Sequence, residues 1–582
     1  KPTFGENLTY FFRYQIAHMY FRYFMWNFVG RQNDVQSTGD PIDGNWMSGI
    51  TALDKSRLGP VDLLPENLKN KGTNYFYFLP LILGLIGLVY QFKNRYQDGL
   101  VVMLLFLMTG LAIILYLNQG PSEPRERDYA YAGSMMAFCM WIAMGVIAIY
   151  NQIKTKVNPV LSAIIVTLIC FAAVPYVMGK NGWNDHDRSG RYTMVAFASN
   201  YLNSCAPNAI LFTNGDNDTF PLWYAQEVEG IRTDVRVVNL SLLNTDWYIN
   251  SMKIKAYKSD PVPISMTIDQ YRQGTRDVVY FIENESIKDP VELNEMIDFV
   301  LSDDPATKHF SSGRKIDYFP SRKFKITVDK NAVITSGTVP KEKADSILSK
   351  MEWSIKGYGV QKNHLAVLDM LAHNNWKRPV YFSITTGGDS YLGLEDYFQL
   401  EGLAYRLVPL KCSNNDGQTG SLNTTVMYDN LMNKFKWGNM QNPKVYLDET
   451  NLRMTMNFRN NFARLASSLI DEGKKDKAIK VLDRSMEVIP EVSVPYNYFI
   501  LPIAETYYKA GAIDKANKIT KRLTDLYEQN LKYFFAFDIS FEKKIKDRKE
   551  QALAIMNRIA MITANYKQTA LAKRAKEIFE KY

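Results

Sequence analysis

Four mostly apolar runs lie close together in the first third of the chain, and they restrict its fold more than any other feature. They cover residues 75–91, 100–117, 134–150 and 159–178. Each has roughly 17–20 residues, which at about 1.5 Å rise per residue nearly matches a hydrocarbon layer of about 30 Å. Buried helices of a soluble protein are the alternative, but short polar loops separate runs that carry almost no charge. We therefore predict four transmembrane helices over residues 75–178.

An earlier run, residues 7–29, is also long enough to cross a bilayer but carries Arg13, His18 and Arg22 among its aromatic residues. A charge at the centre of a bilayer is costly. We predict an amphipathic helix over residues 1–30, lying at the interface or packed against protein, with a true span as the alternative. We expect residues 31–74 to form a loop outside the bilayer.

The pattern changes after Gly179 to mixed α/β. Residues 208–213 and 234–240 have the pattern of buried strands, and residues 221–228 between them that of a helix, which predicts a β-α-β unit with parallel strands. Further strands are expected at 277–282, 323–328 and 379–384, and a helix at 364–372. We predict a soluble α/β domain over residues 179–411 and a linker region over 412–451.

The C-terminal part, residues 452–582, is predicted to be helical and repetitive. Gly473-Lys474-Lys475-Asp476-Lys477-Ala478 returns in altered form as Gly511-Ala512-Ile513-Asp514-Lys515-Ala516. In each copy a helix ends at Gly, an Asp precedes the next helix, and Ala occupies a close helix contact. This resembles tetratricopeptide repeats, although the period exceeds the usual value of about 34 residues. Two similar helical hairpins are the simpler alternative.

Charge and ligand-type residues exclude several classes of function. The net charge of +9 is spread along the chain without a basic block, which favours contact with membrane lipid over nucleic acid. The four cysteines form neither a disulfide framework nor a C-x-x-C pattern, and the five histidines have no metal-ligand spacing. We therefore expect no dedicated metal site of that kind.

Two polar loops among the membrane helices are the candidate substrate site. The first contains Arg31, Asp34, Asn45 and Trp46, and the second contains Arg125, Arg127, Asp128 and Tyr129. Both loops are expected on the same side, because one span crosses the membrane and the next returns. A guanidinium binds phosphate through a planar donor fork, and Trp46 and Tyr129 can stack on a sugar. In the alternative, the arginines pair with Glu123, Glu126 and Asp128 as a structural network.

A second candidate site follows the strand at 208–213. Asp216 and Asp218 come after this strand and before a helix, where ligands bind in parallel α/β sheets. They could hold a divalent cation or sugar hydroxyls, and they spell the unspecific D-x-D of nucleotide-sugar glycosyltransferases. Alternatively, Asp218 or Thr219 caps the helix, with Pro221 in its first turn. The stretch 385–389 after another strand allows the same two interpretations.

Several stretches resemble a family of bacterial membrane proteins long catalogued as a domain of unknown function. They are YFRYFMWNFVGRQND (20–34), GNW (44–46), YFLPLILGLIGL (77–88), PRERDYAYAGS (124–134) and NGDNDTFPLWYAQEVEG (214–230). The family is classed with GT-C glycosyltransferases and is similar to animal protein O-mannosyltransferases of IPT domains. The resemblance implies a partial GT-C-like membrane bundle, a polyprenyl-phosphate-linked sugar donor and a protein hydroxyl acceptor. It also implies a bacterial inner membrane, with chemistry on the periplasmic face, and from this resemblance alone the loop 31–74 is expected on the extracytoplasmic side of the membrane.

GT-C enzymes usually place their catalytic acid in the first extracytoplasmic loop, and this chain resembles the later part of a family member. It begins Lys1-Pro2-Thr3 without Met. We expect the catalytic acid upstream of Lys1, with Asp34 as the remaining candidate within the chain.

Three functions remain open. The first is an O-glycosyltransferase whose C-terminal repeats bind a protein acceptor or partner. The second is a membrane-tethered scaffold without catalysis, and the third is a nucleotide-sugar enzyme that uses Asp216 and Asp218.

Overall fold

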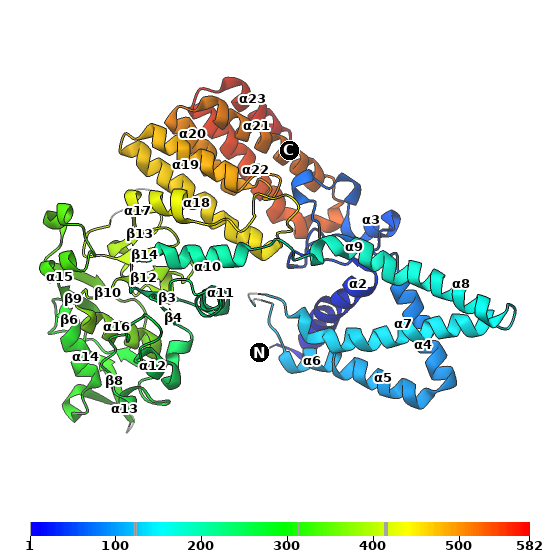
Figure 1. The fold of residues 1–582 in the computed structure, drawn as a ribbon, viewed down its shortest axis with the longest axis horizontal. Helices are drawn as coiled ribbons and strands as arrows, with labels where there is room; N and C mark the ends of the chain where they lie inside the picture. The colour runs from blue at the N-terminus through cyan, green and yellow to red at the C-terminus, as the bar shows by residue number, and fades with distance from the viewer. Residues whose placement is uncertain (1, 122, 124, 312–313, 413–416) are drawn as a thin grey trace. The chain divides into compact units, whose positions relative to one another are not determined.

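The computed structural model describes residues 2–121, 123, 125–311, 314–412 and 417–582 (Figure 1). The chain divides into two compact units, which we describe separately. The helical unit comprises Lys1–Ser189, Asn442–Asn457 and Pro490–Tyr582, and the α/β unit comprises Gly190–Gln441 and Phe458–Ile489. The contacts thus divide the chain differently from the predicted domain boundaries, because the C-terminal helical region contributes to both units.

Apolar helices dominate the N-terminal part of the helical unit. Its helices and short strands are α1 (Phe4–Thr9), the π-helix η1 (Tyr10–Phe21), α2 (Arg22–Phe28), β1 (Gly30–Arg31), α3 (Thr51–Leu58), β2 (Asn74–Tyr75), α4 (Leu79–Asn94), α5 (Tyr96–Met108), α6 (Leu111–Leu117), η4 (Asp128–Tyr131), α7 (Ala132–Ile153), α8 (Pro159–Phe171), η5 (Ala172–Tyr176) and α9 (Val177–His186).

Among the described residues, three helical stretches are long and apolar enough to cross a membrane, where the sequence predicted four. They are Tyr96–Leu117, Asp128–Ile153 and Pro159–His186. The remaining predicted span, residues 75–91, corresponds to the shorter helix α4, whose 16 residues extend about 24 Å. Helix α4 begins only at Leu79, because Tyr75 belongs to a strand and Phe78 has a left-handed backbone with φ of +61°.

Small residues allow helices α4 and α7 to approach closely. A Cβ atom added to Gly87 would lie 1.7 Å from the carbonyl oxygen of Trp141, and one added to Gly145 would lie 2.2 Å from that of Leu83. Glycine pairs of this kind let helix backbones pack where the hydrophobic effect between helices is weak. Helix α7 also contacts α5 and α8.

The N-terminal helices pack against protein rather than crossing alone. Tyr20, Phe24 and Phe28 are buried in one cluster with Phe138 and Trp141 of α7. This is the protein-packed form of the helix predicted for residues 1–30, and no candidate span was found in it.

The α/β unit contains a six-stranded sheet in the order β15-β13-β14-β12-β3-β4. Strands β12, β3 and β4 are parallel, and all of their residues are buried. The predicted β-α-β unit is therefore confirmed as β3, α11 and β4. Two smaller sheets have the orders β10-β9-β6 and β11-β5-β8-β7.

The elements of the α/β unit up to residue 429 are α10 (Thr193–Ser204), β3 (Ile210–Thr213), α11 (Asp216–Glu227), β4 (Arg236–Asn239), α12 (Asp246–Met252), α13 (Ile268–Tyr271), β5 (Val278–Phe281), β6 (Val291–Glu292), α14 (Leu293–Leu301), β7 (Lys308–Ser311), β8 (Arg314–Phe319), β9 (Lys323–Thr327), α15 (Lys330–Thr335), β10 (Lys350–Ser354), β11 (Gly359–Gln361), α16 (Lys362–Asn374), β12 (Val380–Ser383), β13 (Phe398–Leu400), β14 (Ala404–Leu407), β15 (Ser421–Leu422) and α17 (Thr424–Asp429).

Both predicted boundaries of the α/β domain shift toward the C-terminus. At its start, α9 continues the last span to His186, so the domain begins with α10 rather than at residue 179. At its end, β15 pairs with β13, so the described part of the predicted linker 412–451 belongs largely to this unit.

The last part of the chain forms the helices α18 (Glu449–Asp471), α19 (Lys475–Val488), α20 (Leu501–Ala510), α21 (Ile513–Phe535), α22 (Glu542–Asn565) and α23 (Thr569–Lys581). Gly473 and Gly511 have φ of +76° and +85° at the ends of α18 and α20. Ala478 and Ala516 are fully buried in the helices that follow. The predicted helix ends at Gly and the buried Ala residues are confirmed, whereas Asp476 and Asp514 lie in the first turns of α19 and α21 rather than before them. The assignment to tetratricopeptide repeats stays a prediction.

Candidate functional site

Arg22 joins the two polar loops of the helical unit. Its Nη1 donates to the carbonyl oxygen of Gly44 at 2.6 Å, and its Nη2 donates to Oε1 of Glu126 at 2.5 Å. The Arg22 side chain is only 6% exposed, and its guanidinium lies 4.3 Å from the centre of the Tyr23 ring. The two loops therefore meet at one end of the apolar helices, as the sequence predicted.

Glu126 is held by residues of the N-terminal helix. Besides Arg22, it accepts a hydrogen bond from the Tyr23 hydroxyl, and its Oε1 lies 3.4 Å from Nε2 of His18. Burial alone would raise the pKa of Glu126, but the bond with His18 and the charge of Arg22 outweigh it and lower the pKa to about 2. Glu126 is thus a structural carboxylate and a poor proton acceptor.

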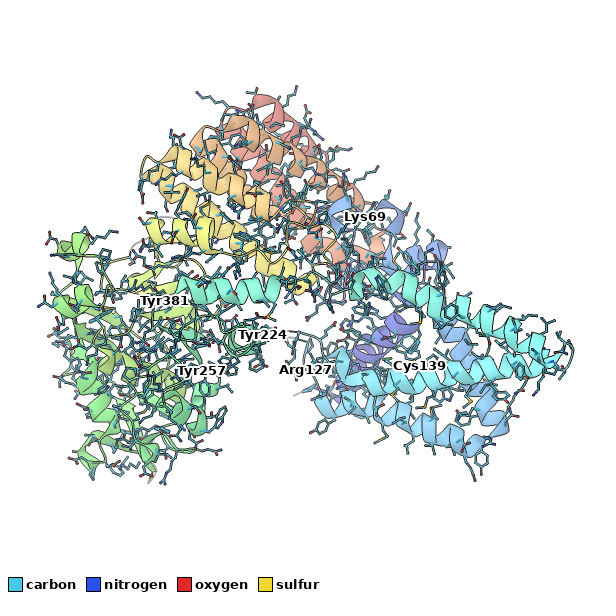
Figure 2. The ribbon with its side chains drawn as sticks, viewed as in Figure 1. Lys69, Arg127, Cys139, Tyr224, Tyr257 and Tyr381 are labelled. Carbon is cyan, nitrogen blue, oxygen red and sulfur yellow. The ribbon has the colours of Figure 1, made fainter. Side chains whose placement is uncertain are left out.

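Arg125, Arg127 and Tyr129 remain exposed on the second loop (Figure 2 labels Arg127). Among the described residues, Arg127 forms an ion pair with Glu123 alone, with Nη2 4.0 Å from Oε2, and the two side chains are 49% and 40% exposed. Glu126 pairs with Arg22 instead of the neighbouring arginines. The structural network proposed as the alternative for this loop is therefore mostly absent among the described residues.

A cavity of about 450 Å³ lies beside the ends of two candidate spans. We call it the interfacial cavity. It is lined by Trp26, Asn27, Arg31, Asn74, Phe76, Asp128, Met178, Gly179, Gly182, Trp183 and His186. It brings together two predicted site residues, Arg31 of the first loop and Asp128 of the second.

Arg31 and Trp26 supply hydrogen-bond donors at this cavity. Nε of Arg31 donates to the carbonyl oxygen of Gly72 at 2.8 Å, and Nη2 pairs with the buried Asp185. The guanidinium lies 5.4 Å from the centre of the Trp26 ring. Nε1 of Trp26 is buried and has no hydrogen-bond partner among the described residues. A bound water or ligand is one way in which a buried donor of this kind obtains a hydrogen-bond partner.

The other predicted residues of the first loop do not line this cavity. Oδ1 of Asp34 accepts a hydrogen bond from Asn70 at 2.7 Å, and its Oδ2 accepts one from the Tyr446 hydroxyl. Nδ2 of Asn45 donates to three oxygens of the same loop. The Trp46 ring lies under the Arg57 guanidinium, 3.3 Å from its centre. These three side chains stabilise the loop itself.

A second cavity of about 340 Å³ lies next to Glu126 in the same unit. Arg13, Tyr14, His18 and Glu123 are among the residues that line it. From the sequence, Arg13 and His18 were recognised only as charges in an apolar run. Their shared cavity could not be predicted, because it forms by packing against the second loop.

Asp216 and Asp218 occupy different environments in the α/β unit. Asp216 is exposed, whereas Oδ2 of Asp218 accepts hydrogen bonds from Thr385 at 2.6 Å and Ser383 at 3.2 Å. Burial raises the pKa of Asp218, and these hydrogen bonds partly oppose the rise. Asp218 therefore ties the start of α11 to the segment after β12. Within the described part of the chain, no group of three or more His, Cys, Asp or Glu side chains could hold a metal ion.

Neither Asp218 nor Thr219 caps the helix α11, so the alternative interpretation of these residues as a helix cap is wrong. Gly215, with φ of +77°, precedes α11, and no side chain caps the helix. Thr219 donates to the carbonyl oxygen of Gly215 at 2.8 Å instead, and Pro221 lies inside the helix.

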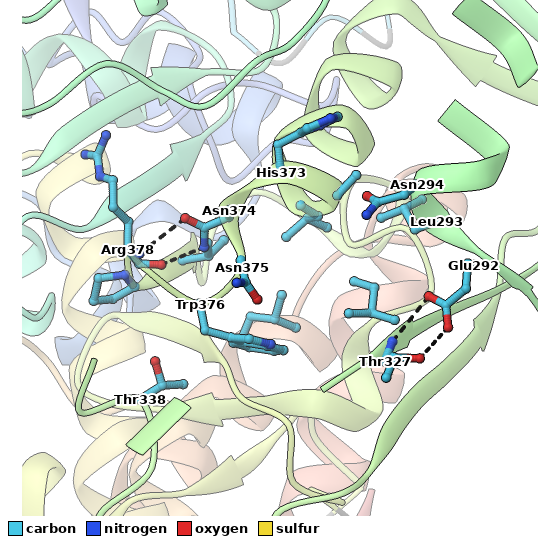
Figure 3. A pocket seen from close by; sticks show the side chains of 16 residues that line it. Glu292, Leu293, Asn294, Thr327, Thr338, His373, Asn374, Asn375, Trp376 and Arg378 are labelled. Atoms are coloured by element: carbon cyan, nitrogen blue, oxygen red, sulfur yellow. Dashed lines mark hydrogen bonds between the residues drawn. The ribbon is translucent and has the colours of Figure 1, made fainter. Parts of the chain in front are cut away.

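Figure 3 shows a cavity of about 470 Å³ at the start of β12. Several of its polar side chains already have partners. Glu292 accepts from the backbone N–H and the hydroxyl of Thr327, and the Asn374 amide bonds the backbone N–H and carbonyl oxygen of Arg378. Nδ1 of His373 lies 3.0 Å from Oδ1 of the fully buried Asp369. These groups mainly satisfy one another.

A further cavity of the α/β unit, polar and about 430 Å³ in volume, lies near the carboxyl ends of the parallel strands. We call it the strand-end cavity. It is lined by Asn214, Ser241, Asn244, Gly357, Tyr358, Gly359, Gln361, Asn363, His364, Asp389 and Ser390. The sequence pattern places Asn214 and Asp389 after predicted strands. It gives no signal for Asn244, Asn363 and His364, because only the tertiary structure brings these segments together.

Part of the chain matches the model of a known family. Residues 194–426 match a family model described as the TMEM260-associated domain 2. This range covers most of the α/β unit and includes residues 214–230, one of the stretches that carry the family resemblance. No solved structure matches the chain.

Proposed function

We propose that the chain is part of an integral membrane glycosyltransferase that transfers a sugar from a polyprenyl-phosphate donor to a protein hydroxyl on the extracytoplasmic face. The interfacial cavity carries this proposal. It lies at the start of the candidate span Asp128–Ile153 and near the end of Pro159–His186. A donor whose prenyl chain lies in the bilayer presents its phosphate and sugar at this level.

The side chains at the cavity suit such a donor. The Arg31 guanidinium can donate to phosphate oxygens, and the unpaired Nε1 of Trp26 adds a neutral donor. The Asp128 carboxylate can accept hydrogen bonds from sugar hydroxyls. Arg125 and Arg127 precede Asp128 on the same loop, and we propose that they contact the leaving phosphate.

The proposed reaction is a direct displacement. The acceptor oxygen bonds to the anomeric carbon, the bond from that carbon to the phosphate oxygen breaks, and the hydroxyl proton passes to a base. Cationic donors stabilise the charge that develops on the leaving phosphate. Asp34 has less support as the base, because both of its carboxylate oxygens accept hydrogen bonds within its own unit.

The alternative of a nucleotide-sugar enzyme has weaker support. Asp218 is engaged by two hydroxyl groups and Asp216 is exposed, so the D-x-D pair does not form a joint site for a nucleotide sugar. In the main proposal, the C-terminal helices contribute the surface that binds a protein acceptor or partner.

Binding of a short-chain polyprenyl phosphate to the full chain in detergent tests the proposal. Calorimetry should detect binding, and Arg31→Lys, which keeps the charge but loses the planar fork, should weaken it about tenfold. Arg125→Lys and Arg127→Lys should weaken it as well. Arg13→Lys, at the other cavity of this unit, is the matched control and should bind normally. Equal binding by all variants, or by the uncharged polyprenol, would contradict the proposal.

A further inference from the structure

We propose that the strand-end cavity of the α/β unit is a binding site for an uncharged carbohydrate. This goes beyond the proposed donor site, because it concerns another unit of the chain and another class of ligand. It depends on neither the interfacial cavity nor the transfer reaction.

The cavity lies where parallel α/β sheets usually bind ligands. Asn214 directly follows β3, Ser241 follows β4, and Asp389 and Ser390 follow β12. The first turn of α16 supplies Asn363 and His364. Ligands commonly bind outside the carboxyl ends of parallel strands, because the loops that converge there are free to carry polar groups.

A hydrogen-bonded framework holds the walls of this cavity. Nδ2 of Asn363 donates to the carbonyl oxygen of Leu240 at 3.0 Å, and its backbone N–H donates to Oδ1 of Asn244 at 3.1 Å. The Ser241 hydroxyl donates to Oδ1 of Asn214 at 2.8 Å. These bonds connect the loops after β3 and β4 with α16, so the cavity is largely formed before a ligand binds.

Other polar groups at the cavity are unused. The partly buried His364 ring, the exposed Asp389 carboxylate and the exposed Gln361 amide make no side-chain hydrogen bond among the described residues. Together they offer a carboxylate acceptor, an amide and an imidazole, and these groups can both donate to and accept from the hydroxyl groups of a ligand. The polar groups of the cavity in Figure 3 are instead mostly paired with one another.

Charge and shape narrow the ligand class. None of the described lining residues is Lys or Arg, and Asp389 supplies a negative charge, so a phosphate or other anion is disfavoured. Tyr358 is 69% exposed and lies against Tyr280, with ring centres 6.1 Å apart. An exposed, supported ring provides an apolar platform with a polar edge. The volume of about 430 Å³ lies within the range of small-ligand sites.

The test measures binding of uncharged methyl glycosides of common hexoses and N-acetylhexosamines to the full chain in detergent. Saturation-transfer NMR detects binding, and titration up to about 10 mM covers the weak affinity expected for a monosaccharide. We expect at least one glycoside to bind, and Asp389→Asn and His364→Gln to reduce its affinity about tenfold. His373→Gln is the matched control, because His373 lies on the same helix but lines the other cavity.

Tyr358→Ala keeps the test informative if a cavity variant misfolds, because this exposed ring supports no core. It should also weaken binding, whereas Tyr257→Ala, another exposed tyrosine of the unit (labelled in Figure 2), should not. Absence of binding by every glycoside, or binding unchanged in Asp389→Asn, His364→Gln and Tyr358→Ala, would overturn the proposal. Stronger binding of the corresponding sugar phosphate would also overturn it. Polyprenyl phosphate binding at Arg31 is measured separately, so either proposal can fail alone.

Discussion

Arg22 and Glu126 form a buried ion pair between the N-terminal helix and the second polar loop, with Nη2 and Oε1 2.5 Å apart. The same guanidinium donates to the carbonyl oxygen of Gly44 in the first loop. One side chain thus holds both loops at the same end of the apolar helices. Because both partners are buried, removing only one leaves an uncompensated charge.

A double-mutant cycle measures this pair. Arg22→Met or Glu126→Gln alone should cost about 3–5 kcal/mol, and the double variant should cost clearly less than the sum. Thermal unfolding in detergent, followed by intrinsic fluorescence, gives the comparison. The exposed pair of Arg127 and Glu123 is the control and should contribute at most about 1 kcal/mol. Strict additivity at Arg22 and Glu126 would refute the coupling.

The same carboxylate predicts a pH dependence of stability. Folding lowers the pKa of Glu126 from an ordinary 4.5 to about 2. A depressed carboxyl pKa stabilises the folded state fully above 4.5, and this contribution is lost as the pH falls toward 2. The melting temperature of the wild type should therefore fall more steeply across this window than that of Glu126→Gln. Parallel curves would show that Glu126 does not titrate as described.

Arg548 of α22 should stabilise the first loop. Its Nη2 lies 2.5 Å from Oδ2 of Asp43 and 3.2 Å from Oδ2 of Asp40. Burial raises the pKa of Asp43, and Arg548 opposes that rise. Arg548→Ala should cost about 2–3 kcal/mol, less than a fully buried pair because the Arg548 side chain is 35% exposed.

The free energy of unfolding that Arg548→Ala loses should become smaller as the pH is lowered toward 4. Burial raises the pKa of Asp43, so the folded variant then binds a proton at Asp43 that the unfolded chain does not bind. Arg558 lies on α22 like Arg548 and pairs at the surface with Glu505 of α20, so Arg558→Ala should change stability little. Urea unfolding at several pH values distinguishes the two variants. The contacts of Arg548 also mean that deleting residues 452–582 would disturb the first loop, so point variants are the cleaner test of the C-terminal helices.

Gly473 and Gly511 should be required for their backbone conformation alone. No atom lies within 4 Å of a Cβ added at either position, yet both have positive φ. Alanine at either site should therefore cost about 1–2 kcal/mol through backbone strain. Gly5→Ala in the exposed helix α1 is the control and should be neutral or stabilising. Thermal melts that show no loss for Gly473→Ala and Gly511→Ala would refute this.

The proposed topology has the soluble parts outside the cytoplasm. Lys93 lies in the last turn of α4, Arg95 lies between α4 and α5, and Lys154 and Lys156 follow α7, which fits the positive-inside rule. Basic residues also lie at the opposite ends of the helices, among them Lys69, Lys71, Arg125, Arg127, Lys180, Arg188 and Arg191. A periplasm-dependent reporter fused after Tyr582 should be active, and one inserted after Lys156 should be silent. The reverse pattern would invert the topology.

Local patterns in the sequence were sufficient for the elements whose causes are local. Length and low charge identified the apolar helices, strand-helix-strand alternation identified β3, α11 and β4, and Gly473 and Gly511 identified two helix ends. These features depend on neighbouring residues, so a linear sequence contains most of the information. The α4 boundary was missed because a left-handed Phe78 depends on how the preceding loop pairs with β1.

Only the tertiary structure decided which side chains meet. Arg31 and Asp128 line one cavity, as predicted. The side chains of Asn45 and Trp46 instead contact other residues of the first loop, and Asp34 accepts hydrogen bonds from Asn70 of that loop and from Tyr446. Glu126 forms its ion pair with Arg22, which is 104 residues away, and not with the adjacent Arg125 or Arg127. The strand-end cavity likewise combines segments between residues 214 and 390. A polar group takes the partner that best compensates its burial, and that partner is set by packing between distant segments rather than by sequence spacing.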